Sequence, residues 1–166
     1  MRRLRFVRRF TRNEKGGPLA ELAILIPFLI VMAASVSELG RLFQAYSTLS
    51  KSTRNAARYL SGQAYNDDTI DNAKHMAFCG KLTCEEGDAP VVSGLELANI
   101  AVDPEWRDGE AGGTLLRVTV RVQNYSFKPL FNLAGLLGAD RFASLRVSPS
   151  TTMYYMLNDT ASAEGE

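Results

Sequence analysis

The longest uncharged stretch of the chain predicts a membrane-spanning helix. Residues 22–37 carry no charge, and residues 22–34 are apolar without a break. This stretch is slightly shorter than the roughly 17–25 residues that a spanning helix needs. Leu19, Ala20 and the apolar face beyond Glu38 lengthen it. We therefore expect residues 17–38 to cross a bilayer.

The helical pattern continues beyond this stretch but becomes amphipathic. Apolar positions recur at alternating spacings of three and four residues, which places them on one face of a helix. The expected buried face comprises Leu39, Leu42, Tyr46, Leu49, Thr53, Ala56 and Leu60, widened by Phe43 and Ala57. The expected polar face comprises Glu38, Arg41, Gln44, Thr48, Lys51, Ser52 and Asn55. One helix is predicted from near Leu19 to Ser61, with Gly62 as its stop and residues 39–62 packed on a soluble domain.

Residues 63–157 predict a head of mixed structure. A short helix is expected over residues 68–78, with acidic side chains near its start. Strict alternation over residues 116–123 predicts a half-buried strand. Residues 143–155 predict a second strand, whose interruption at Pro149 indicates an edge position or a bulge. A weaker third strand is expected over residues 95–102.

These elements predict an α+β fold in which a long N-terminal helix packs on a small antiparallel sheet. The apolar segment 126–140 lies between the two stronger strands and is expected to cover the sheet as a loop or short helix. Residues 158–166 are expected to form a polar tail.

The charges are distributed asymmetrically. Residues 1–16 carry seven Lys and Arg side chains against one acid, Glu14, although the net charge of the whole chain is only +1. Basic residues before a membrane segment favour a cytoplasmic N-terminus and an external head. A nucleic-acid-binding arm would leave the apolar run unexplained, so we expect no nucleic-acid partner.

The side chains capable of chemistry do not form a catalytic pattern. Cys79 and Cys84 are expected to form a disulfide in an oxidising compartment, and a single pair is a poor zinc site. His75 is expected to be structural or on the surface. The acidic loop 103–110 lacks the ligand spacing of a known calcium loop, so a solvated turn anchored by Trp106 is expected. We expect no enzyme activity, no cofactor and no metal.

The segment GGPLAELAILIP carries an unusual combination of residues, with Glu21 at the start of the apolar run and Pro27 inside it. If the chain is cut after Gly16, the new amino group of Gly17 lies about one helical turn from the Glu21 carboxylate. The two charges can then neutralise each other, or the carboxylate can pair with the amine of a neighbouring helix. A charge at a membrane boundary is costly and marks function. Pro27 removes one backbone hydrogen bond and weakens the helix locally.

These residues resemble the TadE-like pseudopilins of tight-adherence (Flp, type IVb-like) pilus systems. That family shares a glycine before the cut, a glutamate five residues later and a proline six residues beyond it, the places of Gly16, Glu21 and Pro27 here. SELGR and STRNAARYLSG, later in the helix, are also similar, so the resemblance covers roughly residues 15–62. The family often has an aromatic residue where this chain has Leu22.

The resemblance implies a pilin-like fold and a minor pilin or pseudopilin. It implies processing at Gly16–Gly17 by a prepilin peptidase and roles for Glu21 and Pro27 in assembly. The implied partners are that peptidase, other minor pilins, the major Flp pilin, the inner-membrane assembly platform and membrane lipid. The implied location is the bacterial inner membrane, with the head in the periplasm, and an extracellular pilus after assembly.

Two other interpretations stay open. An uncleaved single-pass signal-anchor protein with a periplasmic binding domain would treat Glu21 as a boundary charge. A soluble domain released by signal peptidase would be cut after the small residues Ala33, Ala34 and Ser35. Against the second stand the arginine-rich leader and the helix that continues in phase.

Overall fold

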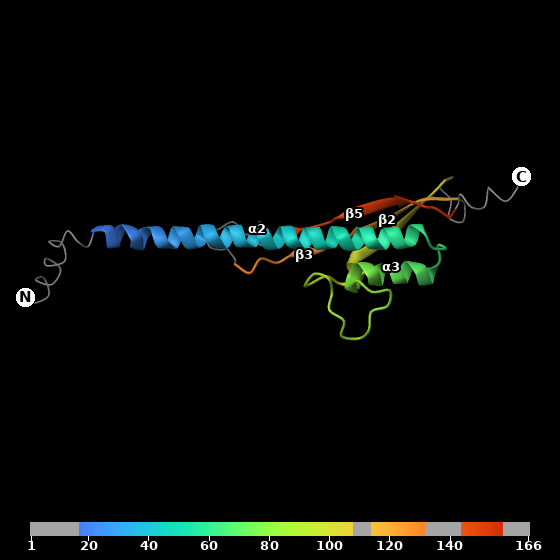
Figure 1. Cartoon of the computed structure of the whole chain (residues 1–166), viewed down its shortest axis with the longest axis horizontal. Helices are drawn as coiled ribbons and strands as arrows, with labels where there is room; N and C mark the ends of the chain where they lie inside the picture. Colours follow the sequence, from blue (N-terminus) through green and yellow to red (C-terminus); the bar gives the residue numbers. More distant parts are fainter. Residues whose placement is uncertain (1–16, 108–113, 132–143, 158–166) are drawn as a thin grey trace, which may run out of the picture.

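One long helix, α2 (Gly17–Ser61), runs through most of the molecule, as the computed structural model shows in Figure 1. The structure describes residues 17–107, 114–131 and 144–157. The prediction of a single helix is confirmed, and it passes through Pro27 without interruption. Ser35 Oγ donates to the Val31 carbonyl oxygen at 2.8 Å, which satisfies a hydroxyl inside the apolar half.

The second helix, α3 (Asp67–Cys79), confirms the helix expected over residues 68–78. It begins with a capping box, in which the Asn66 side chain accepts from the Thr69 N–H at 2.9 Å and Thr69 Oγ1 accepts from the Asn66 N–H at 3.1 Å. Gly80 ends the helix with φ of 80°, and its N–H donates to the Met76 carbonyl oxygen. That left-handed conformation favours glycine.

Within the described residues, five strands form two small antiparallel sheets. The larger sheet contains β1 (Ile100–Trp106), β2 (Leu115–Val122) and β5 (Ser150–Tyr154) in the order β1-β2-β5. The smaller sheet pairs β3 (Ser126–Phe127) with β4 (Leu145–Arg146). A short 3-10 helix, η2 (Leu97–Asn99), precedes β1. The α+β class predicted from the sequence is confirmed.

The larger sheet is buried on one face only. Helix α2 packs against β2 and β5, and α3 packs against α2 and β1. The alternation predicted for β2 holds from Val118 to Val122, since Val118 and Val120 are completely buried on the helix-covered face. It is wrong at the start of the strand, where Leu115 is buried and Leu116 only partly buried. On the other face Thr119 and Thr152 share a hydroxyl hydrogen bond of 2.7 Å in solvent. Half-buried antiparallel sheets show this inside–outside alternation.

The last strand closes the head against the first helix. Thr151 Oγ1 in β5 lies 3.2 Å from Thr53 Oγ1 in α2, and the Met156 N–H donates to the Ser61 carbonyl oxygen at 3.0 Å. The Tyr155 hydroxyl donates to the Gln63 carbonyl oxygen at 2.7 Å. These contacts hold the C-terminal part of the head along α2.

The prediction for the first strand was wrong in its limits. The strand expected over residues 95–102 begins at Ile100 and continues to Trp106, through residues that were expected to form a solvated turn. An edge strand tolerates Pro104 because proline has no backbone N–H, and a position that faces away from the neighbouring strand does not need one. The neighbouring acids pair with β2, where Arg117 lies 2.7 Å from Glu105 and Arg121 lies 2.9 Å from Asp103. Residues 108–110 of the expected turn lie outside the described residues.

The strand expected over residues 143–155 is divided as predicted at Pro149. Its two parts, β4 and β5, belong to different sheets, and β5 is an edge strand. The Leu145 side chain in β4 is exposed. Of the expected covering segment 126–140, the first two residues form β3, and residues 132–140 lie outside the described residues.

The face of α2 that packs on the head differs from the predicted face at its N-terminal end. Leu39, Phe43 and Tyr46 were expected to be buried but are exposed, whereas Glu38 and Ser52 were expected on the polar face but are buried. Ser52 can be buried because its hydroxyl donates to the Leu49 carbonyl oxygen at 2.9 Å. The helix-to-head core comprises Ala45, Leu49, Thr53, Ala56, Ala57 and Leu60.

Candidate functional site

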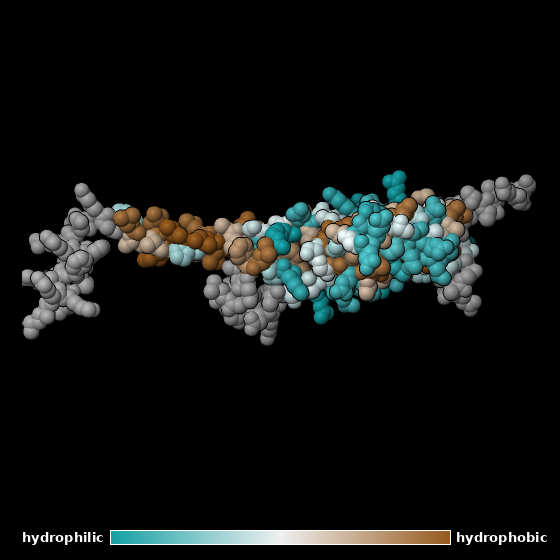
Figure 2. All heavy atoms as spheres, turned by 90° about the horizontal axis from the view of Figure 1, so that it is seen from below, coloured by the Kyte–Doolittle hydropathy of each residue, from teal (hydrophilic) through white to brown (hydrophobic). Residues whose placement is uncertain are grey.

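The apolar N-terminal half of α2 has no covering structure among the described residues. This is the part of the described chain that is long and apolar enough to cross a membrane, and none of its most apolar window is buried. Figure 2 shows apolar side chains, in brown, along the part of the helix that projects from the head, and mainly hydrophilic side chains, in teal, over the head itself. Exposed apolar surface of this extent needs a lipid or protein environment.

The predicted site residues are placed along this exposed half. Gly17 is the first residue of α2, and Glu21 lies four residues later on the same face and is exposed. Pro27 lies within the helix. No hydrogen bond or ion pair of the Glu21 side chain occurs within the described part of the chain. Gly16, the other half of the expected processing site, lies outside the described residues.

A buried carboxylate marks the place where the exposed half of α2 meets the head. Glu38 is only 9% exposed. Its Oε1 accepts hydrogen bonds from the backbone N–H groups of Leu130 at 2.8 Å and Phe131 at 3.2 Å. Arg41 Nη1 donates to both carboxylate oxygens, at 3.1 and 3.0 Å. Glu38 therefore joins the helix to a segment more than ninety residues later in the chain.

Arg41 extends this connection to the smaller sheet. Its guanidinium carbon lies 5.4 Å from the centre of the Phe127 ring in β3, within the range of a cation–π contact. The helical pattern of the sequence predicts Glu38 and Arg41 on the polar face of the helix and indicates neither contact. The sequence feature that could have indicated an ion pair here is the spacing of Glu38 and Arg41, opposite charges three residues apart directly after an apolar run.

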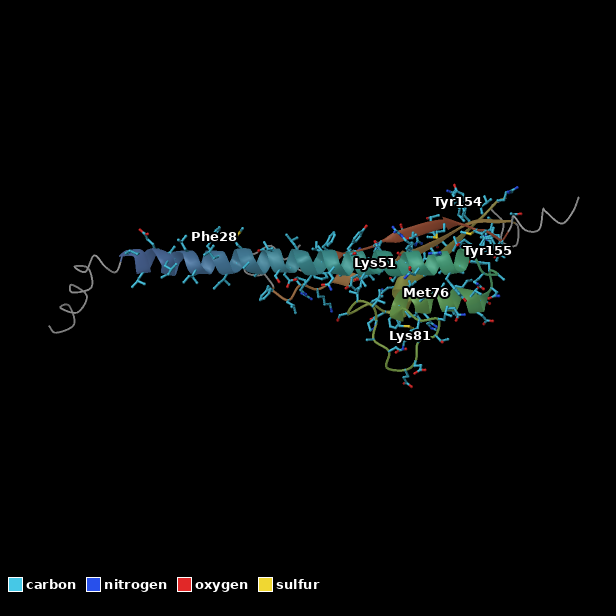
Figure 3. The ribbon with its side chains drawn as sticks, in the orientation of Figure 1. Phe28, Lys51, Met76, Lys81, Tyr154 and Tyr155 are labelled. Carbon is cyan, nitrogen blue, oxygen red and sulfur yellow. A yellow bond between two sulfur atoms is a disulfide. The ribbon has the colours of Figure 1, made fainter. Side chains whose placement is uncertain are left out.

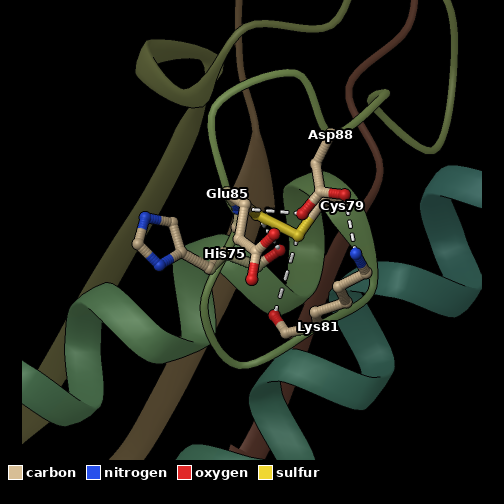
Figure 4. A network of polar contacts seen from close by, with 6 residues as sticks. His75, Cys79, Lys81, Glu85 and Asp88 are labelled. Carbon is tan, nitrogen blue, oxygen red and sulfur yellow. Dashed lines mark hydrogen bonds and ion pairs between the residues drawn. A yellow bond between two sulfur atoms is a disulfide. The ribbon is translucent and has the colours of Figure 1, made fainter.

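The two cysteines staple the loop that follows α3. Figure 4 shows the disulfide between Cys79 and Cys84, whose Cα atoms are 6.2 Å apart. In the same loop Lys81 Nζ lies 2.6 Å from Asp88 Oδ1, and Asp88 Oδ2 accepts from the Glu85 N–H at 2.8 Å. The hydrogen bond from Lys81, followed by that from Glu85, lowers the pKa of Asp88. The loop is thus held by one disulfide and one ion pair.

Removing this disulfide is expected to cost modest stability. The bond closes a loop with a sequence separation of five, and chain-entropy arguments give roughly 2 kcal/mol for so short a loop. The double change Cys79→Ser/Cys84→Ser should lower the free energy of unfolding by about that amount. Chemical denaturation of the full chain would measure it. Thr83→Ala keeps the bond and is the control. Equal stability with and without a reducing agent would contradict the expectation.

The remaining polar groups of the described residues do not assemble a metal centre. Across residues 17–107, 114–131 and 144–157, no group of three or more His, Cys, Asp or Glu side chains could hold a metal ion. His75 Nδ1 is buried without a hydrogen-bond partner in that same part of the chain, beside the disulfide in Figure 4. One unpaired ring nitrogen provides neither a nucleophile nor a ligand set.

The similarity to known proteins lies in the long helix and not in the head. Residues 19–58 match the family model described as TadE-like protein. This segment lies entirely within α2 and includes both its exposed apolar half and most of its buried stripe. No curated protein and no solved structure matches the chain.

The match indicates what kind of protein carries this helix. The TadE-like proteins are a pilin-like structural family, not an enzyme family. The exposed apolar helix is consistent with membrane anchoring, and the TadE-like family that its sequence matches is associated in general with pilus components. From the sequence of its long helix, the chain is consistent with a TadE-like protein of tight-adherence pilus systems.

Proposed function

We propose that this chain is a minor pilin or pseudopilin that takes part in assembling a tight-adherence pilus. One observation carries the proposal. The TadE-like match falls on a single continuous helix whose first half is apolar and exposed and whose second half forms the core of the head. A subunit of this form can be held in a bilayer and later in a filament by the same apolar segment.

The proposed topology divides the chain into five parts. Residues 1–16 are a basic cytoplasmic leader, residues 17–38 cross the inner membrane, and residues 39–62 continue the helix into the head. Residues 63–157 form the periplasmic head, and residues 158–166 are a polar tail. The excess of basic residues in the leader supports this orientation.

Processing at Gly16–Gly17 is the central step of the proposal. A prepilin peptidase would remove the leader and create a positive amino group at Gly17. Glu21 lies on the same face of α2 and, without an internal partner, would pair with this amine or with that of a neighbouring pilin. Such a pair would fix the register between helices. Pro27 would weaken the helix locally and help the subunit leave the bilayer. The partners would be other minor pilins, the major Flp pilin and the assembly platform.

The intact mass and N-terminal residue of the membrane-extracted chain test this proposal. With the peptidase, we expect loss of the first sixteen residues and an N-terminal Gly17; without it, the chain should stay uncut. Gly16→Leu should stay uncut in both cases. Glu21→Gln should be cut normally but fail to enter sheared pili, whereas Glu96→Gln, an exposed acid of the head, should enter them as wild type does.

Two results would overturn the proposal in different directions. An uncut wild-type chain in the presence of the enzyme would favour the signal-anchor interpretation. A cut near Ser35 that does not need the enzyme would favour a soluble secreted domain.

A further inference from the structure

The end of the head nearest the exposed half of α2 carries a collar of exposed apolar side chains. Its members come from α2, from the segment after β3 and from β4: Leu39, Phe43, Tyr46, Leu130, Phe131 and Leu145. Phe43 and Leu130 are exposed by 74% and 72%. The Glu38 carboxylate accepts hydrogen bonds from the N–H groups of Leu130 and Phe131. The segment after β3 therefore lies beside α2 at the level of Glu38. The collar is therefore continuous with the apolar surface of the helix.

The length of the spanning segment indicates at which level the collar lies. Residues 17–38 rise about 33 Å at 1.5 Å per residue, which matches a hydrocarbon core about 30 Å thick. The collar begins at Leu39, directly after this segment. It therefore lies at the outer boundary of the hydrocarbon core, next to the lipid headgroups.

The charged groups at this level are suited to a lipid interface. The Glu38 carboxylate is neutralised by Arg41, so it can lie at a membrane boundary without an unpaired charge. Lys128 and Arg146 are exposed beside the collar. A surface groove lined by Arg41 and Lys128 also contains one exposed acid, Glu96. Cations near apolar anchors favour anionic headgroups.

We propose that this collar enters the outer leaflet of the bilayer and that its cations contact lipid phosphates. The inference rests on the proposed function, because it requires α2 to span the membrane. A neighbouring copy is the competing occupant. Residues 22–37 of a neighbouring helix, however, carry no charge with which to meet these cations. The collar holds the head upright against the membrane and must be released from lipid when the subunit is extracted.

Depth-dependent fluorescence quenching tests the collar in the full chain. Trp106, the single tryptophan, is first changed to phenylalanine. Tryptophan is then introduced singly at Phe28, Phe131 or Tyr154; Figure 3 labels Phe28 in the helix and Tyr154 at the far end of the head. Each variant is reconstituted into vesicles of phosphatidylethanolamine and phosphatidylglycerol that carry a spin label either near the headgroup or near the end of the acyl chain.

The expected result has three parts. Phe28→Trp should lose most of its emission to the deep label, Phe131→Trp should lose most of its emission to the shallow label, and Tyr154→Trp should be unaffected by both. Adding Lys128→Glu and Arg146→Glu should reduce the quenching of Phe131→Trp in these vesicles.

Each contrary result has a distinct meaning. If Phe28→Trp is quenched but Phe131→Trp emits as in water, the collar proposal fails and the spanning helix survives. If Phe131→Trp is shielded from water yet not quenched, a protein partner covers the collar and the lipid proposal fails. If Phe28→Trp is not quenched, the membrane span and the collar fail together. Unchanged quenching with the two glutamates would overturn the proposed contact with phosphates.

Discussion

Replacing Leu60 with alanine is expected to destabilise the head by about 2–5 kcal/mol, the usual range for a fully buried leucine. Leu60 has no exposed surface and lies in the core that α2 forms with the sheet. Truncation removes apolar contacts and leaves a cavity that the long helix and the central strand cannot readily close. Denaturation of the full chain in detergent micelles, followed by near-ultraviolet circular dichroism of Trp106, would measure the loss.

The same substitution at Leu39 is the matched control. Both leucines lie on one predicted stripe of the helix, but Leu39 is 65% exposed. Leu39→Ala should therefore change the free energy of unfolding by no more than about 0.5 kcal/mol. Equal losses at the two positions would mean that the stripe is buried along its whole length, as the sequence pattern alone predicts.

Replacing Glu38 with alanine is the second change with a large expected effect. It removes the acceptor of two partly buried backbone N–H groups and the partner of Arg41. A fully buried donor left unsatisfied costs about 1–3 kcal/mol. Because these donors and Arg41 are only partly buried, we expect a total loss of about 2–3 kcal/mol. Hydrogen exchange at the amides of Leu130 and Phe131 should accelerate strongly, while exchange in the central strand β2 should change only in proportion to global stability.

Two further variants separate the parts of this effect. Glu38→Gln keeps an oxygen acceptor for the two N–H groups but loses the charge, so it should retain most of the local protection from exchange. Glu105→Ala removes an exposed ion pair with Arg117 and should cost at most about 1 kcal/mol. If Glu38→Ala left the exchange of both amides unchanged, the proposed joint between helix and head would be wrong.

The parts of the fold that were predictable from the sequence are those with strong local signals. The long helix follows from an apolar run that passes in phase into an amphipathic stripe, and α3 follows from its acidic start. Strand β2 follows from its alternation, which survives because its two faces meet different environments. In each case the residues that determine the element lie within it.

The parts that were not predictable depend on contacts between distant segments. Strand β1 contains Pro104 between two acids, and only its pairing with β2 makes it a strand. The burial of Glu38 depends on backbone N–H groups more than ninety residues later. The exposure of Leu39 depends on where the head ends along the helix. The spacing of apolar residues shows which side of α2 is apolar. It does not show how far along that side the head extends.

The pairing of β5 with the first helix has a consequence for the order in which the protein matures. During synthesis α2 is made first, yet its hydrogen bonds to the C-terminal part of the head, from Thr53 to Thr151 and from Ser61 to Met156, need residues made almost a hundred positions later. Nearly the whole chain must therefore be translated before the head can close. Until then the apolar stripe around Leu49 and Leu60 is only partly covered, because β5 is missing from the surface that packs on α2. A chaperone or the membrane face must shield the rest from aggregation. A ribosome that stalls before Ser150 would release a chain with a finished helix and an open core.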